Sequence, residues 1–388
     1  MRHVVFLANL LFSFSLAITT YVNSSFIAEA VGTGAVGVVY IISALITIFM
    51  LARASKVVRE MGNRKYFFFS AAIHVLSLLL LALPLGGFAR IIGFVVYLIS
   101  GTTLSVSFDI FFEHTAEKKN RGRTRGLYLA LSNLGWVVGP LVTATLIDFF
   151  GYKGVYTISL CIVILFTVLL RLELYNYKDP AYTPHAARLS IHKAWNIPGI
   201  RMVVLSNFML QIFYMWMIVY VPIYLTQNLG LSWDSIGLIF SVMLTAFVIL
   251  DYPLGRLADK LGSEKELAAI GFLIMAASVF GFAFLPTITV GMVAFLMIIS
   301  RVGAATVETM TEVHFFKITS DSNPLLITLF RDLRPIATVV TPIVALSGFA
   351  FLGFRYSFAL FGMLMIAGFF FALGLERHRK WWTRDHKN

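Results

Sequence analysis

The sequence predicts an all-α polytopic membrane protein with twelve transmembrane helices in two pseudo-symmetric six-helix bundles. Three observations support this fold class. First, 59% of the 388 residues are hydrophobic and only 13% are charged, with a mean hydropathy of +0.85, whereas about a quarter of the residues of a soluble domain are charged. Second, apolar runs recur at roughly the 20 residues that a helix needs to cross a bilayer. Third, the two halves of the chain repeat each other.

The apolar runs are continuous and do not alternate with polar residues. Helices and closed barrels are the structures that can span lipid, and continuous runs favour helices. The first run resembles a signal peptide because Ala28-Glu29-Ala30 could be a cleavage site, but it is longer than a usual signal core, so we expect it to remain as a span. The expected spans cover residues 4–23, 32–53, 66–85, 88–113, 126–149, 154–172, 201–225, 233–254, 267–286, 288–315, 325–349 and 353–375.

The longest connector lies at the midpoint of the chain, at residues 173–200. It separates an expected N-terminal bundle, residues 1–172, from an expected C-terminal bundle, residues 201–376, and a basic tail follows at 377–388. The connector contains three prolines and is polar apart from a short stretch around Trp195. That stretch fits either an interfacial helix with the tryptophan at headgroup depth or a plain linker.

The two halves share uncommon residues in the same order. The offset between equivalent positions runs from 198, between Asn9 and Asn207, to 202, between Pro140 and Pro342. Two halves related by an internal repeat are the plan of several carriers, in which the substrate binds near the midplane and access alternates as the halves rock. The other equivalent pairs are Gly37 with Gly237, Gly62 with Gly262, Gly151 with Gly353, and Lys153 with Arg355.

The positive charges are distributed unequally between alternate loops. Of the 31 Lys and Arg residues, 25 lie in one set of loops together with the two chain ends, and only Arg90, Lys153 and Arg355 lie in the opposite set. This bias places both termini in the cytoplasm by the positive-inside rule. The net charge of +12 is therefore explained by membrane topology, and we expect no nucleic-acid partner.

Several kinds of chemistry are missing from the sequence. The single cysteine, Cys161, excludes a disulfide within the chain, and no His or Cys set has the spacing of a metal site. There is no phosphate-binding loop of the Gly-x4-Gly-Lys-(Ser/Thr) type and no catalytic constellation. We therefore expect no cofactor, no metal and no enzymatic activity.

A short charged loop is expected between the eighth and ninth spans. Its order of glycines and charges resembles the loop signature of the major facilitator superfamily, Gly-x3-Asp-(Arg/Lys)-x-Gly-(Arg/Lys)-(Arg/Lys), although Ser263-Glu264 replaces the final basic pair. The first-half copy is degraded, because Arg59-Glu60 inverts the order of the charges. A polar connector is the alternative interpretation. The residues of this loop motif are Gly255, Arg256, Asp259, Lys260 and Gly262.

The resemblance implies a gating role for this loop. Asp259 is expected to cap or pair with the start of the fifth span, near Arg125 and Gly126, while the transporter faces outward. The loop is thus expected to act as a latch and not as the substrate site.

The fifth span carries a second resemblance. Its pattern is similar to Gly-x8-Gly-x3-Gly-Pro-x2-Gly-Gly, the signature of proton-coupled antiporters in the same superfamily, with Thr143-Ala144 in place of the last glycines. The resemblance implies export in exchange for protons. Close packing of small residues, with a proline kink, is the alternative. The matching residues are Gly126, Gly135, Gly139 and Pro140.

Ionisable residues within spans are candidates for function because their burial is costly. Asp109 and Glu113 lie four residues apart, as do Glu308 and Glu312, so each pair shares a helix face. For Glu113 and Glu312 we favour a gate; for Asp109 and Glu308 both gating and proton loading in a low dielectric remain open. Arg301 either binds an anionic substrate or neutralises Glu308. The eleventh span adds Arg331, Asp332 and Arg334.

In the superfamily the first and seventh spans face the cavity. The polar and aromatic residues there suit an amphipathic or aromatic substrate, with helix packing as the alternative for each. Two absences weigh against proton antiport: the first span has no acid before Glu29, and Tyr97 replaces a mid-span arginine of the fourth. The candidate cavity residues are Asn9, Tyr97, Asn207, Gln211, Tyr214, Trp216 and Tyr220.

The sequence therefore predicts a monomeric multi-pass protein of the cell membrane. We expect a secondary active transporter that works by alternating access and exports a small organic molecule in exchange for protons. The alternative is a proton-coupled importer of a sugar or an organic anion. A membrane enzyme or a scaffold is the remaining class, and the intact repeat argues against it.

Overall fold

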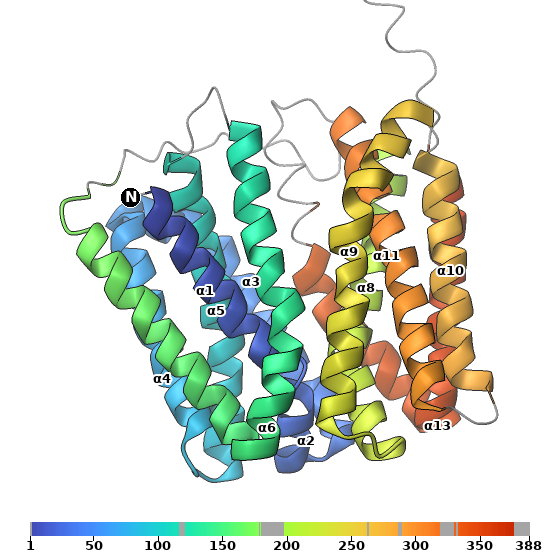
Figure 1. Ribbon diagram of the computed structural model, residues 1–388, viewed down its shortest axis with the longest axis horizontal. Helices are drawn as coiled ribbons and strands as arrows, with labels where there is room; N and C mark the ends of the chain where they lie inside the picture. The colour runs from blue at the N-terminus through green and yellow to red at the C-terminus, as the bar shows by residue number, and fades with distance from the viewer. Residues whose placement is uncertain are drawn as a thin grey trace, which may run out of the picture. The chain divides into compact units, whose positions relative to one another are not determined.

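The computed structural model describes the chain except residues 1, 116–120, 178, 180–197, 262–263, 286–288, 319–329, 331–332 and 376–388. Every regular element in the described ranges is a helix (Figure 1). The helices are α1 (Arg2–Thr20), α2 (Asn23–Val31), α3 (Thr33–Met61), α4 (Asn63–Ala82), α5 (Gly87–Thr115), α6 (Arg121–Glu173), α8 (Pro198–Ile223), the π-helical turn η2 (Tyr224–Asn228), α9 (Trp233–Leu261), α10 (Glu264–Phe284), α11 (Val290–Ile318) and α13 (Leu333–Leu373).

Ten helices in the described part of the chain are long and apolar enough to cross a membrane. Two of them, α6 and α13, contain a glycine with non-helical geometry, Gly151 at φ 64° and ψ −170° and Gly353 at φ 73° and ψ 169°. A positive φ of this kind is readily adopted only by glycine. Figure 1 shows α6 turning back on itself, in agreement with the non-helical geometry of Gly151. Each of these long helices therefore consists of two helical segments, and the glycine pair noticed in the repeat marks both breaks.

Several helices extend beyond the apolar runs that predict them. The expected charged loop after residue 254 is wrong for most of its length, because α9 continues to Leu261 and includes Gly255, Arg256, Asp259 and Lys260. Apolar length measures only the part of a helix that lies in lipid. Beyond it, Leu257, Ala258 and Leu261 are good helix formers, so the backbone continues as a helix. The stretch around Trp195 lies outside the described residues.

The first expected span is broken near its end. The Val22 backbone N–H bonds to the Thr19 carbonyl at 3.2 Å, three residues back, so the Ile18 carbonyl does not receive its usual partner four residues on. The hydroxyl of Thr143 on α6 donates to that carbonyl at 2.7 Å. The chain then continues as α2 from Asn23. A hydroxyl from a neighbouring helix therefore satisfies the backbone group that the break releases.

The chain divides into two compact units. Unit 1 contains Met1–His185, Trp216–Ser241 and Thr338–Leu346, and unit 2 contains Ala186–Met215, Val242–Ala337 and Ser347–Asn388. Unit 1 thus combines the helices of the first half with segments of α8, α9 and α13. The expected bundles, residues 1–172 and 201–376, remain a prediction.

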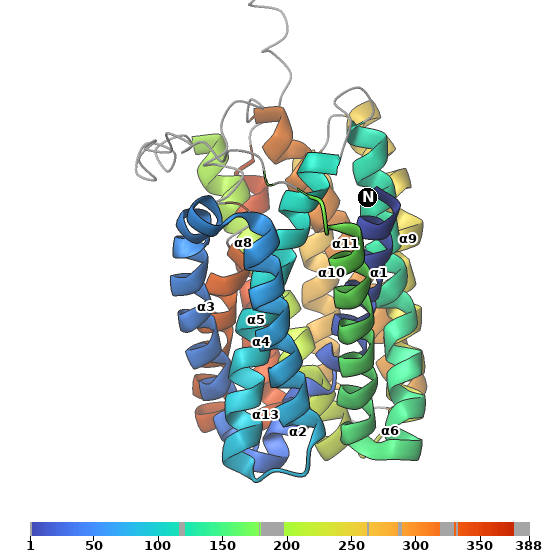
Figure 2. The same cartoon turned by 90° about the vertical axis from the view of Figure 1, so that its left-hand side faces the viewer.

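Unit 1 is built around an aromatic core. The fully buried rings of Phe67, Phe108 and Phe166 pack edge to face, with ring centroids 5.4 Å apart for Phe67 and Phe108 and 5.8 Å apart for Phe108 and Phe166. Phe12 of α1 stacks on Phe108 at 5.1 Å. Such pairs add to the stabilisation from burial of the rings. Figure 2 shows α4 and α5, which carry Phe67 and Phe108, running side by side.

In unit 2, the backbones of α10 and α11 approach each other closely at two glycines. A Cβ added at Gly271 would lie 2.8 Å from the carbonyl oxygen of Gly303, and one added at Gly303 would lie 2.7 Å from that of Gly271. Small residues allow such close approach between membrane helices. This packing fixes the position of α11, which carries the charged residues of the candidate site.

Candidate functional site

Unit 2 holds a carboxylate in the spanning part of α11. Glu308 is half-buried, and its Oε2 accepts a hydrogen bond of 2.6 Å from the Tyr214 hydroxyl on α8. Among the described residues no cation lies within ion-pair distance of this carboxylate. The guanidinium groups of Arg334 and Arg301 interact with it electrostatically. Glu308 is therefore held by a neutral hydroxyl and not by a salt bridge.

Arg301 lies two turns before Glu308 on the same helix. Its side chain is 2% exposed, and its Nε donates to Met243 Sδ at 3.4 Å. The guanidinium carbon lies 5.5 Å from the ring centroid of Phe213 and 5.9 Å from that of Tyr214, within the range of cation–π attraction. Tyr214 thus contacts both charged residues, with its ring near Arg301 and its hydroxyl on Glu308.

Two amides continue this surface along α8. Asn207 is buried and its Nδ2 donates to the carbonyl oxygen of Phe330 at 3.2 Å, while Gln211 Nε2 donates to Asn207 Oδ1 at 3.3 Å. The Tyr214 ring lies 6.2 Å from Phe247 of α9. Three residues predicted to line a cavity, Asn207, Gln211 and Tyr214, therefore occur on successive turns beside the charged pair.

The other predicted charges are more scattered. Asp109 is half-buried in α5 and belongs to unit 1, whereas Glu308 belongs to unit 2. Glu312 is exposed on α11, and Arg334 is exposed in the first turn of α13. The Glu113 side chain, Arg331 and Asp332 lie outside the described structure. Of the predicted acids, Glu308 is thus the one that the structure places among candidate substrate contacts.

Unit 1 contains a buried, uncharged polar cluster. The Tyr97 hydroxyl bonds to the Thr19 hydroxyl at 2.5 Å, and the Tyr156 hydroxyl donates to Asn23 Oδ1 at 2.8 Å. The fully buried His74 ring stacks on Tyr97 with centroids 5.0 Å apart. These residues interlock α1, α2, α4, α5 and α6. His74 is thus a packed polar residue of this cluster.

The remaining predicted cavity residues also belong to unit 1. Asn9 Nδ2 donates to the Ser132 hydroxyl at 2.6 Å, which joins α1 to α6. Trp216 and Tyr220 are fully buried, with ring centroids 4.9 Å apart. The structure therefore divides the predicted cavity between the units, with Asn9, Tyr97, Trp216 and Tyr220 in unit 1 and Asn207, Gln211 and Tyr214 in unit 2.

The fifth-span motif lies on the face of α6 that packs against α1. A Cβ at Gly135 would lie 3.0 Å from the backbone nitrogen of Phe14, and one at Gly139 would lie 2.6 Å from the Ala17 Cβ. Neither position has room for a side chain. The two glycines thus allow two helix backbones to meet, as the packing alternative predicts, while the surroundings of Gly126 lie outside the described side chains.

Gly37 of α3 makes a similarly close contact with segments from the second half of the chain. A Cβ there would lie 2.8 Å from the Tyr220 hydroxyl oxygen and 2.9 Å from the Pro342 Cβ. All three residues belong to unit 1. The glycine is therefore required for α3 to approach α8 and α13 this closely.

Gly237, the equivalent of Gly37 in the repeat, makes the reciprocal contact. A Cβ there would lie 2.6 Å from the Ala144 Cβ and 2.7 Å from the Pro140 carbonyl oxygen. Each glycine thus meets the proline-bearing span of the other half, Gly37 at Pro342 and Gly237 at Pro140. We call these the paired glycine contacts. The sequence repeat identifies these four residues as two equivalent pairs but does not show that they meet.

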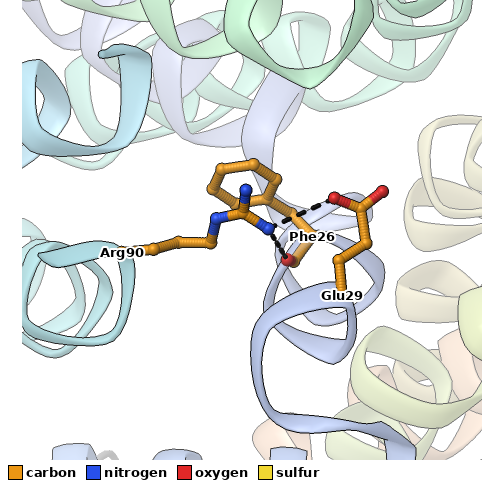
Figure 3. A network of polar contacts seen from close by, with 3 residues as sticks. All are labelled: Phe26, Glu29 and Arg90. Atoms are coloured by element: carbon orange, nitrogen blue, oxygen red, sulfur yellow. Dashed lines mark hydrogen bonds and ion pairs between the residues drawn. The ribbon is translucent and has the colours of Figure 1, made fainter. Parts of the chain in front are cut away.

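A cationic contact pins α2 to the start of α5 within unit 1 (Figure 3). Arg90 Nη1 donates to the Phe26 carbonyl oxygen at 3.1 Å and to Glu29 Oε2 at 3.2 Å. The guanidinium carbon lies 4.1 Å from the centroid of the Phe26 ring. Sequence reasoning counted Arg90 only as a loop charge, and no local signal indicated its partners.

The charged motif at the end of α9 is only partly described. A Cβ at Gly255 would meet no atom within 4 Å, and Arg256 is exposed. The side chains of Asp259, Lys260 and Arg125, together with Gly262, lie outside the described structure. The latch assigned to this motif therefore stays a prediction.

A partly buried ion pair lies directly after this motif. Glu264, in the first turn of α10, is 3% exposed, and its Oε1 accepts from Lys317 Nζ at 2.5 Å. Glu264 stands where the superfamily signature has a basic residue. Sequence reasoning recorded that departure but not its partner, although Lys317 is the one basic residue in the loop that follows the tenth expected span.

In the first half of the chain, the start of α4 after Gly62 is held by a different contact. The Asp179 carboxylate accepts hydrogen bonds from the backbone N–H groups of Asn63 at 3.0 Å and Arg64 at 3.1 Å. It thereby caps the first turn of α4, where backbone donors are otherwise unsatisfied. The Asn63 side chain accepts a hydrogen bond of 2.7 Å from the Ser107 hydroxyl of α5. Asp179, an acid of the connector between the halves, thus stabilises the helix start that follows the first-half copy of the motif.

Comparisons with known proteins agree with this architecture. The family model of the Major Facilitator Superfamily matches residues 5–224 and 203–388. Proteins described as uncharacterized MFS-type transporter YcaD, from Escherichia coli (strain SE11) and from Shigella flexneri, are 28% identical over 165 residues, which is 42% of this chain and 41% of each relative. The match therefore spans about two fifths of the length of these curated relatives.

Two solved structures are similar over nearly the whole chain. A bacterial homolog of the human lysosomal transporter Spinster, in an inward-facing and occupied conformation, has a TM-score of 0.77 at 13% identity and covers 96% of this chain and 95% of its own. A D-xylose-proton symporter has a TM-score of 0.75 at 16% identity and covers 97% of both chains. At these identities the similarity shows the fold alone.

Proposed function

Because this chain belongs to the major facilitator superfamily, it is a multi-pass membrane transporter and not an enzyme. We propose that it is a secondary active transporter and that it couples the movement of a small organic molecule to protons through Glu308. Alternating access between two six-helix bundles is the mechanism we propose. Twelve crossings, two cytoplasmic termini and a monomeric state are part of this proposal.

The state of Glu308 is the observation that carries the proposal. A carboxylate in a span is costly and is a candidate for function by default. Glu308 is half-buried and is bonded to the Tyr214 hydroxyl at 2.6 Å, a partner that can remain whether the carboxyl is charged or neutral. Because no cation of the described residues lies within ion-pair distance of it, the Glu308 carboxyl is not fixed in its charged form and can load and release a proton.

Two directions of coupling follow from different observations. The fifth-span resemblance favours export in exchange for protons, as in the antiporters that carry the full signature. Co-transport with protons is the second candidate, and the buried guanidinium of Arg301 beside Glu308 favours it for an organic anion. A sugar is also a candidate substrate for co-transport, but no specific contact supports it.

We further propose that the paired glycine contacts close the extracytoplasmic side. The positive-inside rule places the loops that contain Arg90 and Lys153 outside the cell. The contacts of Gly37 and Gly237 lie a few residues from the helix starts at Thr33 and Trp233, on that same predicted side. They would separate when the transporter opens outward.

Proton movement in proteoliposomes tests the proposed function. Vesicles that contain a pH-sensitive dye are given a pH gradient and a panel of small organic solutes, and internal pH is followed with solute uptake. Proton flow opposite to the solute supports exchange, proton flow with the solute supports co-transport, and solute transport without any proton flow refutes the coupling. Glu308→Gln should abolish gradient-driven flux and leave passive exchange. Glu173→Gln, at the exposed end of α6, is the matched control and should behave like wild type.

A further inference from the structure

Arg301 is buried, but no carboxylate of the described residues lies within ion-pair distance of it, as one would for an ordinary buried arginine. Its side chain is 2% exposed in the middle of α11. Its one hydrogen bond is the contact of 3.4 Å to the Met243 sulfur, a weak acceptor. In the described part of the chain no carboxylate lies within ion-pair distance of the guanidinium. A buried positive charge without an anion is expensive, so its retention requires a reason.

Glu308 does not supply the missing anion. Its Oε2 is bonded to the Tyr214 hydroxyl, and Arg301 acts on it only at longer range, after Arg334. The sequence left two roles open for Arg301, and the geometry does not support the direct neutralisation of Glu308. The role left is to bind an anion from outside the chain.

We propose that Arg301 holds the anionic group of the transported molecule, and that the substrate class is an organic anion with an apolar or aromatic body. A guanidinium binds carboxylate or phosphate oxygens through two parallel hydrogen bonds. The rings of Phe213 and Tyr214 lie beside the guanidinium, and Phe247 packs on Tyr214, so the three rings offer an apolar wall. The amide of Gln211, one turn from Tyr214, adds a polar group for orientation.

This inference rests on the proposed function, because Glu308 of the same site provides the coupling. An anion at Arg301 places a second negative charge near Glu308 and favours a proton on that carboxyl. By reciprocity, a proton on Glu308 favours the anion. The groups facing Glu308 in the described structure are Tyr214 from α8, Arg301 from α11 and Arg334 from α13. Anion and proton therefore bind together, which selects co-transport from the two coupling modes.

Thermal stabilisation of the purified protein by matched solutes tests the substrate class. The probes are benzoate, phenyl phosphate and octanoate, each compared with the amine and the alcohol of similar body. We expect the anions to raise the melting temperature of the wild type. Arg301→Met should weaken their affinity by about 10- to 100-fold, the value of a charge-assisted hydrogen bond, and Arg301→Lys should weaken it less.

Controls separate the loss of a contact from the loss of the fold. Arg355→Met removes another arginine of unit 2, one that bonds to the Ala283 carbonyl at 3.1 Å, and should leave anion binding unchanged. Arg301→Met should elute as a monodisperse protein, because methionine fills a similar volume without a charge. Wild-type affinity for the anions should rise as the pH falls, and Glu308→Gln should bind them independently of pH.

Three results would overturn the inference: no anion of the panel stabilises the wild type, amines or alcohols stabilise it as well as the anions do, or Arg301→Met binds anions like the wild type. Failure of the proposed function is distinguishable from these. It would show as anion binding that depends on Arg301 together with normal proton-coupled flux in Glu308→Gln.

Discussion

Replacing Gly37 or Gly237 with alanine tests the assignment of the paired glycine contacts to the extracytoplasmic closure. The added Cβ at Gly37 would lie 2.8 Å from the Tyr220 hydroxyl oxygen and 2.9 Å from the Pro342 Cβ. These distances are about 1 Å shorter than the optimal separation of two carbon atoms. The neighbouring helices must move apart to accept the methyl group, and opening the contact relieves the strain completely.

The expected loss of closed-state population follows from the free-energy cost of overpacking. An extra methyl group in a well-packed site costs about 1–3 kcal/mol. If the open state carries none of this strain, the closed state loses about 5- to 150-fold in population relative to it. The value should lie at the upper end for Gly237, because its Cβ would meet the Pro140 backbone oxygen at 2.7 Å, and a backbone atom cannot rotate away.

Labelling of a buried cysteine measures this population. Thr341 neighbours Pro342 and is fully buried, so Thr341→Cys in a Cys161→Ser background reports opening to a membrane-impermeant maleimide added outside. Gly37→Ala should accelerate labelling by at least about 5-fold, in line with the overpacking cost. Gly34→Ala is the matched control on the same helix, because a Cβ there meets no atom within 4 Å, and it should not change the rate.

One result would refute the reasoning directly. If Gly37→Ala and Gly237→Ala label at the wild-type rate while the protein remains folded, the contacts do not limit opening. If Gly34→Ala accelerates labelling as much as Gly37→Ala does, the effect comes from helix propensity and not from the contact.

Three further predictions concern stability, each measured as thermal unfolding in detergent. Lys317→Met leaves the Glu264 carboxylate buried without its partner and should destabilise unit 2 by about 1–3 kcal/mol. The double variant with Glu264→Gln should lose less stability than Lys317→Met alone, and a larger loss of stability in the double variant would contradict the pairing. Asp179→Ala removes the cap of α4 and should cost about 1 kcal/mol, whereas Asp179→Asn should retain most of it; equal losses would argue against capping. Arg90→Met should cost about 1 kcal/mol, and a melting temperature equal to wild type would show that α2 does not depend on this contact.

The fold could be predicted from the sequence because its signals are long and redundant. Apolar length, charge bias and the internal repeat each bear on the same arrangement, and the family model matches both halves. The loop predicted at Gly255 was wrong because apolar length reports immersion in lipid and not where the helical hydrogen bonds end. The break at Gly151 was marked by its place in the repeat, yet its positive φ needed coordinates.

The candidate site was predictable only in part. The sequence analysis identified Glu308 and Arg301 as charged residues of one span, and Tyr214 as a candidate cavity residue of the seventh span. The sequence could not say that Tyr214 bonds to Glu308, because the two residues are 94 positions apart and no local pattern links them. The alternatives for Arg301 therefore stayed open until the surroundings of its guanidinium were known.

The repeat was informative in a different way. It identified Gly37 with Gly237 and Pro140 with Pro342 as equivalent positions, because equivalent residues recur along the chain. Which of them touch depends on how the helices cross, and that is a property of the three-dimensional arrangement. The same holds for the pairs Glu264 with Lys317 and Asp179 with α4, which join segments far apart in sequence.

The bond from Thr143 to the Ile18 carbonyl links a change in one helix to the shape of another. Where the antiporter signature has a glycine, this chain has a hydroxyl, and the hydroxyl satisfies a backbone oxygen that the end of α1 has released. In lipid an unsatisfied carbonyl is not tolerated. Replacement of Thr143 by glycine would therefore remove a donor from the Ile18 carbonyl, so that one side chain on α6 stabilises the break at the end of α1.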